Sequence, residues 1–338
     1  MARRVHAARF LGRTLSLLAA CAAASGCGRA TPGPCVVLYC SVDETVAEEV
    51  IAAFEKETGI AVLARFDTEA SKTVGLVQRL RLEAPKPAAD IFWSGEIFHT
   101  IRLAGEGLLA PHENAEDLPP RFADGQGRWH GFALRARVLG YHTERVAAPP
   151  GRFEDLLDPQ WRGRLVMADP EFGTTAGHVA SLFVHYGEAR AEELLRGLKA
   201  NGVRLVAGNS TAVRMVATGR ADLCLTDTDD VYAAQRNGWP VALRYLGHGE
   251  AGPLAIPNTA ALVKGGPNPR EARELLRFLL SGATETILAA SVSHNTPVRP
   301  EVAEKFPAYA LPETLPIDYA LVAARLPAAI ERARRILR

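Results

Sequence analysis

Residues 36–64 read VVLYCSVDETVAEEVIAAFEKETGIAVLA, and this stretch sets the class of fold. The apolar run at 36–39 predicts a buried strand, and the apolar run at 60–64 predicts another. Between them, residues 44–58 predict a helix that ends at Gly59 and whose apolar face carries Val46, Val50, Ile51 and Phe54. A strand, a helix and a strand in this order predict a parallel β-α-β unit.

The same alternation continues along the chain. Further strands are expected at 90–93, 132–134, 138–141, 164–167, 204–206, 221–225 and 259–263, and helices at 67–83, 98–105, 176–186, 188–201, 209–219, 270–280 and 318–338. We therefore expect an α/β fold of two lobes, each a mostly parallel sheet flanked by helices, with hinge strands between them. The expected parts are lobe 1 at 28–135, lobe 2 at 136–252, and a return to lobe 1 with a C-terminal helix at 253–338.

The first 27 residues predict a leader that is not part of this fold. A basic segment is followed by a short apolar segment that ends in small residues, which is typical of a lipoprotein signal peptide. Cys27 is the expected lipidation site, with Cys21 as the alternative. An ordinary cleaved secretion signal is the other interpretation, and both imply a periplasmic or other extracytoplasmic protein.

The charge of the chain excludes one class of partner. The formal net charge is +1, and removal of the four arginines of the leader lowers it to −3. No cluster of basic residues is interleaved with aromatic residues, so we expect no nucleic-acid partner.

Polar residues gather where the predicted strands end or the helices begin, which is where open α/β sheets bind ligands. The residues expected to bind a ligand are Asp43, Thr68, Glu69, Trp93, Glu96, Asp227, Asp229, Asp230 and Tyr232. Opposite these carboxylates we identify few cations, Lys72 and Arg137, so the predicted cleft is acidic and favours a positively charged ligand. Hard oxygen ligands suit a metal cation, whereas carboxylates beside Trp93 also suit an organic ammonium ion.

Each of these clusters also has a purely structural interpretation. Asp227 or Thr228 could accept hydrogen bonds from the first amides of the following helix, and Asp229 and Asp230 suit the positive end of its dipole. Gly173, Thr174 and Thr175 stand at a helix start, where free amides suit an anion, although they could equally be an ordinary cap.

Five segments in a fixed order carry a resemblance to a known family. LYCSVD, AAFEKETGI, ADIFWSGE, GLLAP and GNSTAVRMVATGRADLCLTD resemble the extracellular solute-binding proteins of the ferric-iron-binding type, which are receptors of ABC importers. The resemblance implies a periplasmic-binding-protein (clamshell) fold, a monomer that closes over its ligand, and a permease with its ATPase as partners. It also implies ferric iron as ligand, held by His, Glu and a Tyr-Tyr pair together with an anion.

The positions that match those ligands differ in this chain. Asp43 stands at the histidine, Gly95 at the glutamate with Glu96 one position later, and Asp229 and Asp230 at the tyrosine pair. The predicted metal ligands are therefore Asp43, Glu96, Asp229 and Asp230, and the predicted anion site is Gly173, Thr174, Thr175 and Asn209. An organic cation or another small polar solute, such as a polyamine, a thiamine-like compound or a phosphorylated sugar, is the alternative ligand.

The sequence contains no motif of a common enzyme class. We find no GxSxG elbow, no Walker-type phosphate loop and no HExxH helix. We therefore expect no catalytic residue and no catalytic cofactor, with hydrolysis by carboxylate pairs as a remote alternative.

Overall fold

The computed structural model describes residues 33–68, 71–112 and 118–338. The chain divides into two compact units, Met1–Pro32 and Gly33–Arg338, and the first lies outside the described residues. The predicted signal peptide, Cys21, Cys27 and Glu69 therefore also lie outside them. No helix in the described ranges has the length and apolarity needed to cross a membrane.

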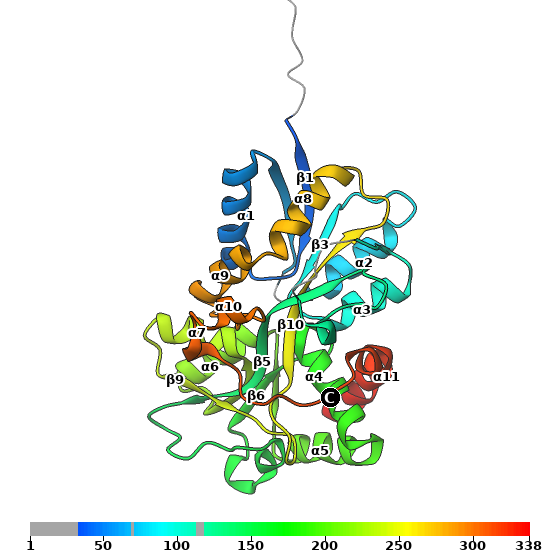
Figure 1. The fold of residues 1–338 in the computed structure, drawn as a ribbon. Helices are drawn as coiled ribbons and strands as arrows, with labels where there is room; N and C mark the ends of the chain where they lie inside the picture. Colours follow the sequence, from blue (N-terminus) through cyan, green and yellow to red (C-terminus); the bar gives the residue numbers. More distant parts are fainter. Residues whose placement is uncertain (1–32, 69–70, 113–117) are drawn as a thin grey trace, which may run out of the picture. The chain divides into compact units, whose positions relative to one another are not determined.

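A ten-stranded sheet runs through the second unit in the order β2-β1-β3-β10-β5-β8-β6-β7, with β4 beside β10 and β9 beside β5 (Figure 1). The strands are β1 (Cys35–Cys40), β2 (Ala61–Phe66), β3 (Ile91–Ser94), β4 (Leu109–Ala110), β5 (His130–His142), β6 (Leu165–Ala168), β7 (Arg204–Val206), β8 (Leu223–Asp227), β9 (Val241–Tyr245) and β10 (Ala255–Val263). β1, β2 and β3 are parallel to one another, as are β6, β7 and β8. The predicted α/β fold with mostly parallel sheets is confirmed.

Two antiparallel strands join the two parallel groups. β5 pairs with β10 as far as Ala136 and with β8 and β9 from Arg137 onward. β10 continues to β3, where Thr259 pairs with Ser94. We call the part built on β1–β4 and β10 lobe 1 and the part built on β6–β9 lobe 2. The long strand β5 therefore passes from lobe 1 to lobe 2 between Arg135 and Arg137.

Eleven α-helices lie in the described ranges, most of them where the sequence predicts them. They are α1 (Glu44–Thr58), α2 (Val74–Leu82), α3 (Phe98–Gly105), α4 (Gly173–Tyr186), α5 (Glu188–Ala200), α6 (Asn209–Ala217), α7 (Thr228–Arg236), α8 (Pro269–Leu279), α9 (Gly282–Ala290), α10 (Pro300–Ala303) and α11 (Tyr319–Leu337). α9 and α10 were not predicted. α2 begins at Val74 and not at 67, after Thr73 has taken a left-handed φ of 68°.

The helices cover the sheet on both faces of each lobe. In lobe 1, α1 buries Val46, Val50 and Phe54 in a core shared with α8 and α9, which confirms most of its predicted face. In lobe 2, α6 and α7 cover one face of the sheet, and α4 and α5 contribute to the core on the other.

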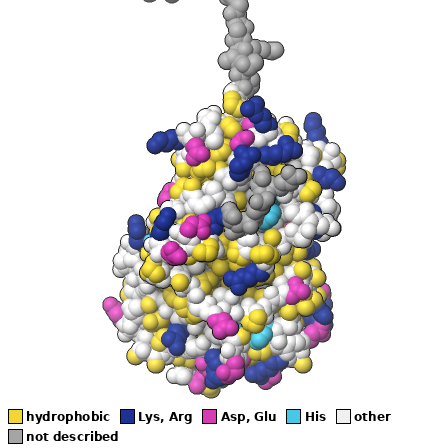
Figure 2. Space-filling model, viewed as in Figure 1, with side chains coloured by type: hydrophobic (Ala, Val, Ile, Leu, Met, Phe, Trp, Pro, Cys, Tyr) yellow, Lys and Arg dark blue, Asp and Glu magenta, His cyan; other side chains and the backbone are white. Residues whose placement is uncertain are grey.

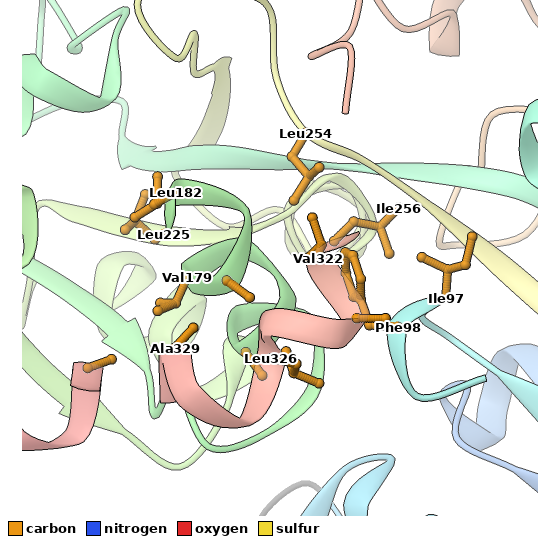
Figure 3. Packing of buried hydrophobic residues seen from close by; sticks show 14 of the residues in the cluster. Ile97, Phe98, Val179, Leu182, Leu225, Leu254, Ile256, Val322, Leu326 and Ala329 are labelled. Carbon is orange, nitrogen blue, oxygen red and sulfur yellow. The ribbon is translucent and has the colours of Figure 1, made fainter. Parts of the chain in front are cut away.

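Helix α11 packs against helices of both lobes. It contacts α4 and α5 in lobe 2 and α3 in lobe 1. Figure 3 shows Phe98 of α3 close to Val322 and Leu326 of α11, in the same cluster as Val179 of α4. The Phe98 ring lies so close to Gly177 of α4 that even a methyl group there would clash with it. The two lobes therefore share one continuous apolar core at this position.

The molecular surface in Figure 2 carries charges of both signs. Lys and Arg side chains are interspersed with Asp and Glu side chains over this face, and hydrophobic side chains gather across its middle. Such mixed charge is ordinary for a globular protein and offers no extended basic surface on this face.

Candidate functional site

A pocket lies where the ends of several strands and helices from both lobes meet. We call it the central pocket; its cavity volume is about 40 Å³. Its lining residues are Ser41, Asp43, Lys72, Thr73, Gly95, Glu96, Arg135, Ala168, Phe172, Gly173, Thr174, Thr175, Ala207, Gly208, Asn209, Asp227, Asp229 and Asp230. The polar residues predicted at separate strand ends are thus brought to one place.

The structure brings nine predicted site residues together here and leaves three outside. Asp43, Glu96, Gly173, Thr174, Thr175, Asn209, Asp227, Asp229 and Asp230 line the pocket, whereas Thr68, Trp93 and Tyr232 do not. Trp93 is fully buried in the core of lobe 1 beside Phe132, because both faces of β3 are covered. Thr68 is exposed in the loop before α2 and bonds to Ser71. Tyr232 packs against His294 and Tyr309. The structure thus places these three side chains outside the central pocket, and their assignment as ligand-binding residues stays a prediction.

Three aspartates at the start of α7 form the most compact carboxylate cluster of the site. Asp227, Asp229 and Asp230 each offer an oxygen, and the three oxygens lie within 4.8 Å of one another. This set differs from the predicted metal ligands, because it includes Asp227 and lacks Asp43 and Glu96. Three carboxylate oxygens this close together suit a hard cation.

Asp227 is held from three sides and does not cap its helix. It accepts hydrogen bonds from Arg137 Nη1 at 2.8 Å, Thr174 Oγ1 at 2.6 Å and Asn209 Nδ2 at 3.0 Å. It makes no side-chain cap bond to the amides of α7. Asp227 is therefore a structural link between the aspartate cluster and the predicted anion-binding residues, and not a helix cap.

Arg135 is a pocket residue that the sequence analysis missed. Its Nη1 lies 2.8 Å from Asp229 and 3.6 Å from Asp227, and its Nη2 donates to the backbone oxygen of Gly95. Arg135 and Arg137 are two residues apart on β5, so their side chains lie on the same face of the strand. The two-residue spacing could have revealed Arg135 in the sequence. If Arg137 faces the cleft from a strand, Arg135 faces it too.

Arg135 reduces the predicted excess of acidic groups in the cleft but does not remove it, because Asp43, Glu96, Asp227, Asp229 and Asp230 all line the pocket. Lys72 pairs with Asp43, Arg135 with Asp229, and Arg137 with Asp227. Each basic group in the pocket thus neutralises one carboxylate. With three basic groups against five carboxylates, the pocket remains acidic overall, although its basic groups can also contact an anion.

Glu96 is occupied by the helix that follows it. Its carboxylate accepts hydrogen bonds from the backbone N–H groups of Phe98 at 2.7 Å and His99 at 3.2 Å, and it lies 3.1 Å from His99 Nδ1. These bonds satisfy free amides at the start of α3. A metal bound by Glu96 would compete with these bonds for the lone pairs of the carboxylate.

Two helices of lobe 2 begin at the central pocket without a side-chain cap. α4 starts at Gly173, whose φ of 55° favours glycine, and α6 starts at Asn209. Among the described residues, no hydrogen bond is made to the backbone amides of Thr174 and Thr175. Uncapped amides and the positive end of a helix dipole attract an anion. Of the two interpretations of Gly173–Thr175, the geometry favours the anion site over the ordinary cap.

The aspartate cluster is electrostatically strained. Burial raises the pKa of Asp229 above its usual range; Arg135 opposes the rise, and Asp227 and Asp43 add to it. Burial, together with Asp229 and Asp227, holds the pKa of Asp230 well above its usual range. A cation bound here would relieve the repulsion among these carboxylates.

Three buried polar atoms at the site have no hydrogen-bond partner within the described part of the chain. They are the acceptor Asp229 Oδ1 and the donors Arg135 Nε and Arg137 Nη2. Buried groups of this kind are costly unless a ligand or water completes them. An acceptor beside two donors suits a ligand that combines a positive centre with an anion.

Comparisons with known proteins identify the family of the chain. Residues 86–322 match the family described as bacterial extracellular solute-binding protein. The major ferric iron-binding protein of Neisseria meningitidis serogroup B is 27% identical over 284 residues, covering 80% of this chain and 83% of that protein. A putative 2-aminoethylphosphonate-binding periplasmic protein of Salmonella typhimurium is 28% identical over 260 residues, covering 74% of this chain and 73% of that protein.

A solved structure extends the match to nearly the whole chain. Iron-bound HitA from Pseudomonas aeruginosa superposes with a TM-score of 0.76 at 27% identity, covering 90% of this chain and 99% of that one. The family match spans well over half of the chain, and the two-lobe fold agrees with it. The chain belongs to the family of bacterial extracellular solute-binding proteins.

Proposed function

We propose that this protein is the receptor of an ABC importer that binds ferric iron together with an anion outside the cytoplasm. The observation that carries the proposal is the convergence of three carboxylate oxygens within 4.8 Å, beside the uncapped starts of α4 and α6. The metal would lie on Asp227, Asp229 and Asp230, and the anion on Thr174, Thr175 and Asn209. The two relatives that bind iron by name support the choice of metal.

The anion has a physical role in this arrangement. Arg135 and Arg137 lie beside the aspartates and would repel a bare trivalent cation. An anion over the helix starts would offset both charges and fill the coordination sites that the protein leaves open. The cavity of about 40 Å³ favours a compact pair of this kind over a large organic ligand.

Transport would follow from closure of the lobes over the ligand. Lobe 1 contributes Asp43, Lys72 and Glu96 to the pocket, and lobe 2 contributes the aspartate cluster. A ligand that contacts both lobes stabilises the closed state, which the permease and its ATPase recognise. We assign the moving parts to the expected ranges 28–135, 136–252 and 253–338, with β5 and β10 as the hinge.

A second candidate ligand is a small organic zwitterion with an ammonium group and a phosphonate or phosphate. It is favoured by the buried donors Arg135 Nε and Arg137 Nη2, which have no partner among the described residues and could bind phosphonate or phosphate oxygens. The similarity to the putative 2-aminoethylphosphonate-binding protein points the same way. In this case the aspartate cluster would bind the ammonium group.

One titration separates the two candidates. The leaderless protein, stripped of metal with a chelator, is unfolded thermally with ferric citrate, with ferric nitrilotriacetate and bicarbonate, or with 2-aminoethylphosphonate. A ligand that binds only the folded state raises the midpoint as its concentration rises. A higher midpoint with either ferric complex supports ferric iron as the ligand. A higher midpoint with 2-aminoethylphosphonate alone supports the zwitterion instead. No rise with any of them contradicts both candidates.

We also propose that the protein is a monomer held at the membrane by a lipid on Cys27, with Cys21 as the alternative. The support is the order of basic, apolar and small residues in the leader. Cys27→Ser and Cys21→Ser are compared by membrane fractionation of cells that express the full chain. Release by one substitution identifies the lipidated cysteine; retention with both changed rejects the anchor.

A further inference from the structure

A line of buried side chains leads from the central pocket to Gly252, where the chain leaves lobe 2. Arg137 Nε lies 3.4 Å from His178 Nδ1, and His178 Nε2 lies 2.9 Å from His248 Nε2. His248 Nδ1 lies 3.3 Å from the backbone oxygen of Gly252. Arg137, His178 and His248 are at most 2% exposed, and neither histidine lines the central pocket. We call these two side chains the histidine pair.

Only one arrangement of protons satisfies every contact in this line. A guanidinium can only donate, so His178 Nδ1 must be the acceptor and its proton lies on Nε2. His178 Nε2 then donates to His248 Nε2, which leaves the proton of His248 on Nδ1. That proton is donated to the Gly252 oxygen. The two histidines must therefore be opposite tautomers, and both must be neutral.

The surroundings keep the histidine pair neutral. Burial lowers the pKa of His178 well below its usual range, and the charge of Arg137 lowers it further. Burial lowers the pKa of His248 to about 4, with His185 and Arg137 lowering it and Glu154 and the Gly252 oxygen opposing. The Phe153 ring stacks on His248 and meets His178 edge-on, and the rings of His185 and Tyr186 also lie against His248.

The line ends where the chain leaves lobe 2. The carbonyl of Leu254 accepts the backbone amide of Arg137 at 2.9 Å, and the carbonyl of Pro253 accepts that of Leu315. Gly252 packs against the backbone of Glu313 so closely that a Cβ would not fit. The segment around Gly252, which accepts the hydrogen bond from His248 Nδ1, is thus held in place by its neighbours.

We propose that His178 and His248 are positioning residues that hold the Arg137 guanidinium in one orientation towards Asp227, Thr174 and Asn209. The Nη1 of Arg137 contacts all three of these pocket residues. Without an acceptor at His178, the guanidinium of Arg137 would be free to rotate about its last bonds. Its contacts with Asp227, Thr174 and Asn209 would then no longer be fixed. The effect on affinity rests on the proposed function of the central pocket, whereas the tautomers and the orientation of Arg137 do not.

Nuclear magnetic resonance of the apoprotein tests the arrangement without any ligand. Two-bond ¹H–¹⁵N spectra at pH 7 should show His178 protonated on Nε2 and His248 protonated on Nδ1. The Nε–H of Arg137 should give a resonance protected from exchange. The same tautomer on both rings, or a proton on both nitrogens of either ring, overturns the proposal.

Three variants then separate positioning from simple loss of packing. His178→Leu removes the acceptor, and we expect the protected Arg137 resonance to disappear and the affinity for ferric citrate to fall about tenfold. His248→Gln keeps an acceptor for His178 and should retain both properties to within about twofold. His142→Gln changes a buried histidine of β5 outside this line and serves as the matched control.

The outcomes distinguish failure of this proposal from failure of the proposed ligand. An intact Arg137 resonance in His178→Leu contradicts the positioning role whatever the ligand. If wild type does not bind ferric citrate, the proposed function fails, yet loss of that resonance in His178→Leu and its retention in His248→Gln still support positioning. If ferric citrate binds equally well to wild type and His178→Leu, the histidine pair has no role in binding.

Discussion

The two walls of the central pocket are built differently. The lobe 2 wall consists of buried side chains that bond to one another, with Asp227 and Arg137 each about 1% exposed. The lobe 1 wall has Asp43 half exposed and paired with Lys72 of its own lobe, while Glu96 bonds to the start of α3. Lobe 2 therefore holds a site that is organised before the ligand arrives, and lobe 1 supplies contacts that matter mainly on closure.

Loss of a charged partner should affect the stability of the two walls very differently. Asp227→Ala leaves Arg137 buried without its carboxylate, and we expect a loss of about 3–5 kcal/mol in the free energy of unfolding. Asp43→Ala removes half of an exposed pair and should cost less than about 1 kcal/mol. Urea unfolding of the apoprotein measures both. Similar losses in the two variants would mean that the walls are equally organised.

Acid should destabilise the protein through the histidines behind the lobe 2 wall. The pKa of His248 is about 4 in the fold and about 6.5 in an unfolded chain. Between these values the unfolded chain binds more protons, so stability falls as the pH drops from 6.5 to 4, by about 3 kcal/mol.

The matched variant for this prediction is His248→Gln, which cannot titrate. Between pH 6.5 and 4, the free energy of unfolding should fall in both proteins, but the fall should be about 3 kcal/mol smaller in the variant than in wild type. Parallel curves for the two proteins would show that His248 is not buried in its neutral form.

The affinity of the site should depend more on lobe 2 than on lobe 1. Asp229→Asn combined with Asp230→Asn should weaken binding of ferric citrate at least about tenfold, which corresponds to about 1.4 kcal/mol. Asp43→Asn should weaken it about threefold, because that carboxylate is half exposed and screened. Isothermal titration calorimetry measures both, and equal losses would remove the distinction between the walls.

The smallest expected effect is a release of protons on binding. Because the pKa of Asp230 lies well above its usual range, the empty site retains a proton that a bound cation displaces. Titrations in buffers of different ionisation enthalpy should show release of protons on binding, and less release in Asp230→Asn. A binding enthalpy that does not change with the buffer would contradict this.

The sequence predicted the fold better than it predicted the site. Strand and helix periodicity gave the β-α-β units, and open α/β sheets bind ligands at strand ends, so nine of the predicted residues do line one pocket. Trp93 was misplaced because a strand buried on both faces shows no alternation. Glu96 lines the pocket as predicted, but its bonds to the start of α3 were not foreseen, because a carboxylate after a strand can equally bind a ligand or cap the next helix.

The charge balance of the pocket was predicted only in part, because Arg135 was missed. Arg135 could be found only by extending a strand through residues that read as a polar connection, and only side-chain geometry reveals its pairing with Asp229. The three-aspartate cluster likewise depends on side-chain orientation, since Asp227 and Asp229 are on a strand end and a helix start respectively. Periodicity carries no information about such pairings.

The contacts of Arg135 have a consequence for the speed of capture. Its guanidinium bonds to Gly95 in lobe 1 and to Asp229 in lobe 2, so the protein bridges its own lobes without a ligand. A ligand can enter only from the open population, which this bridge makes smaller. We therefore expect the association rate to be set by how often the bridge opens, and not by diffusion to the pocket.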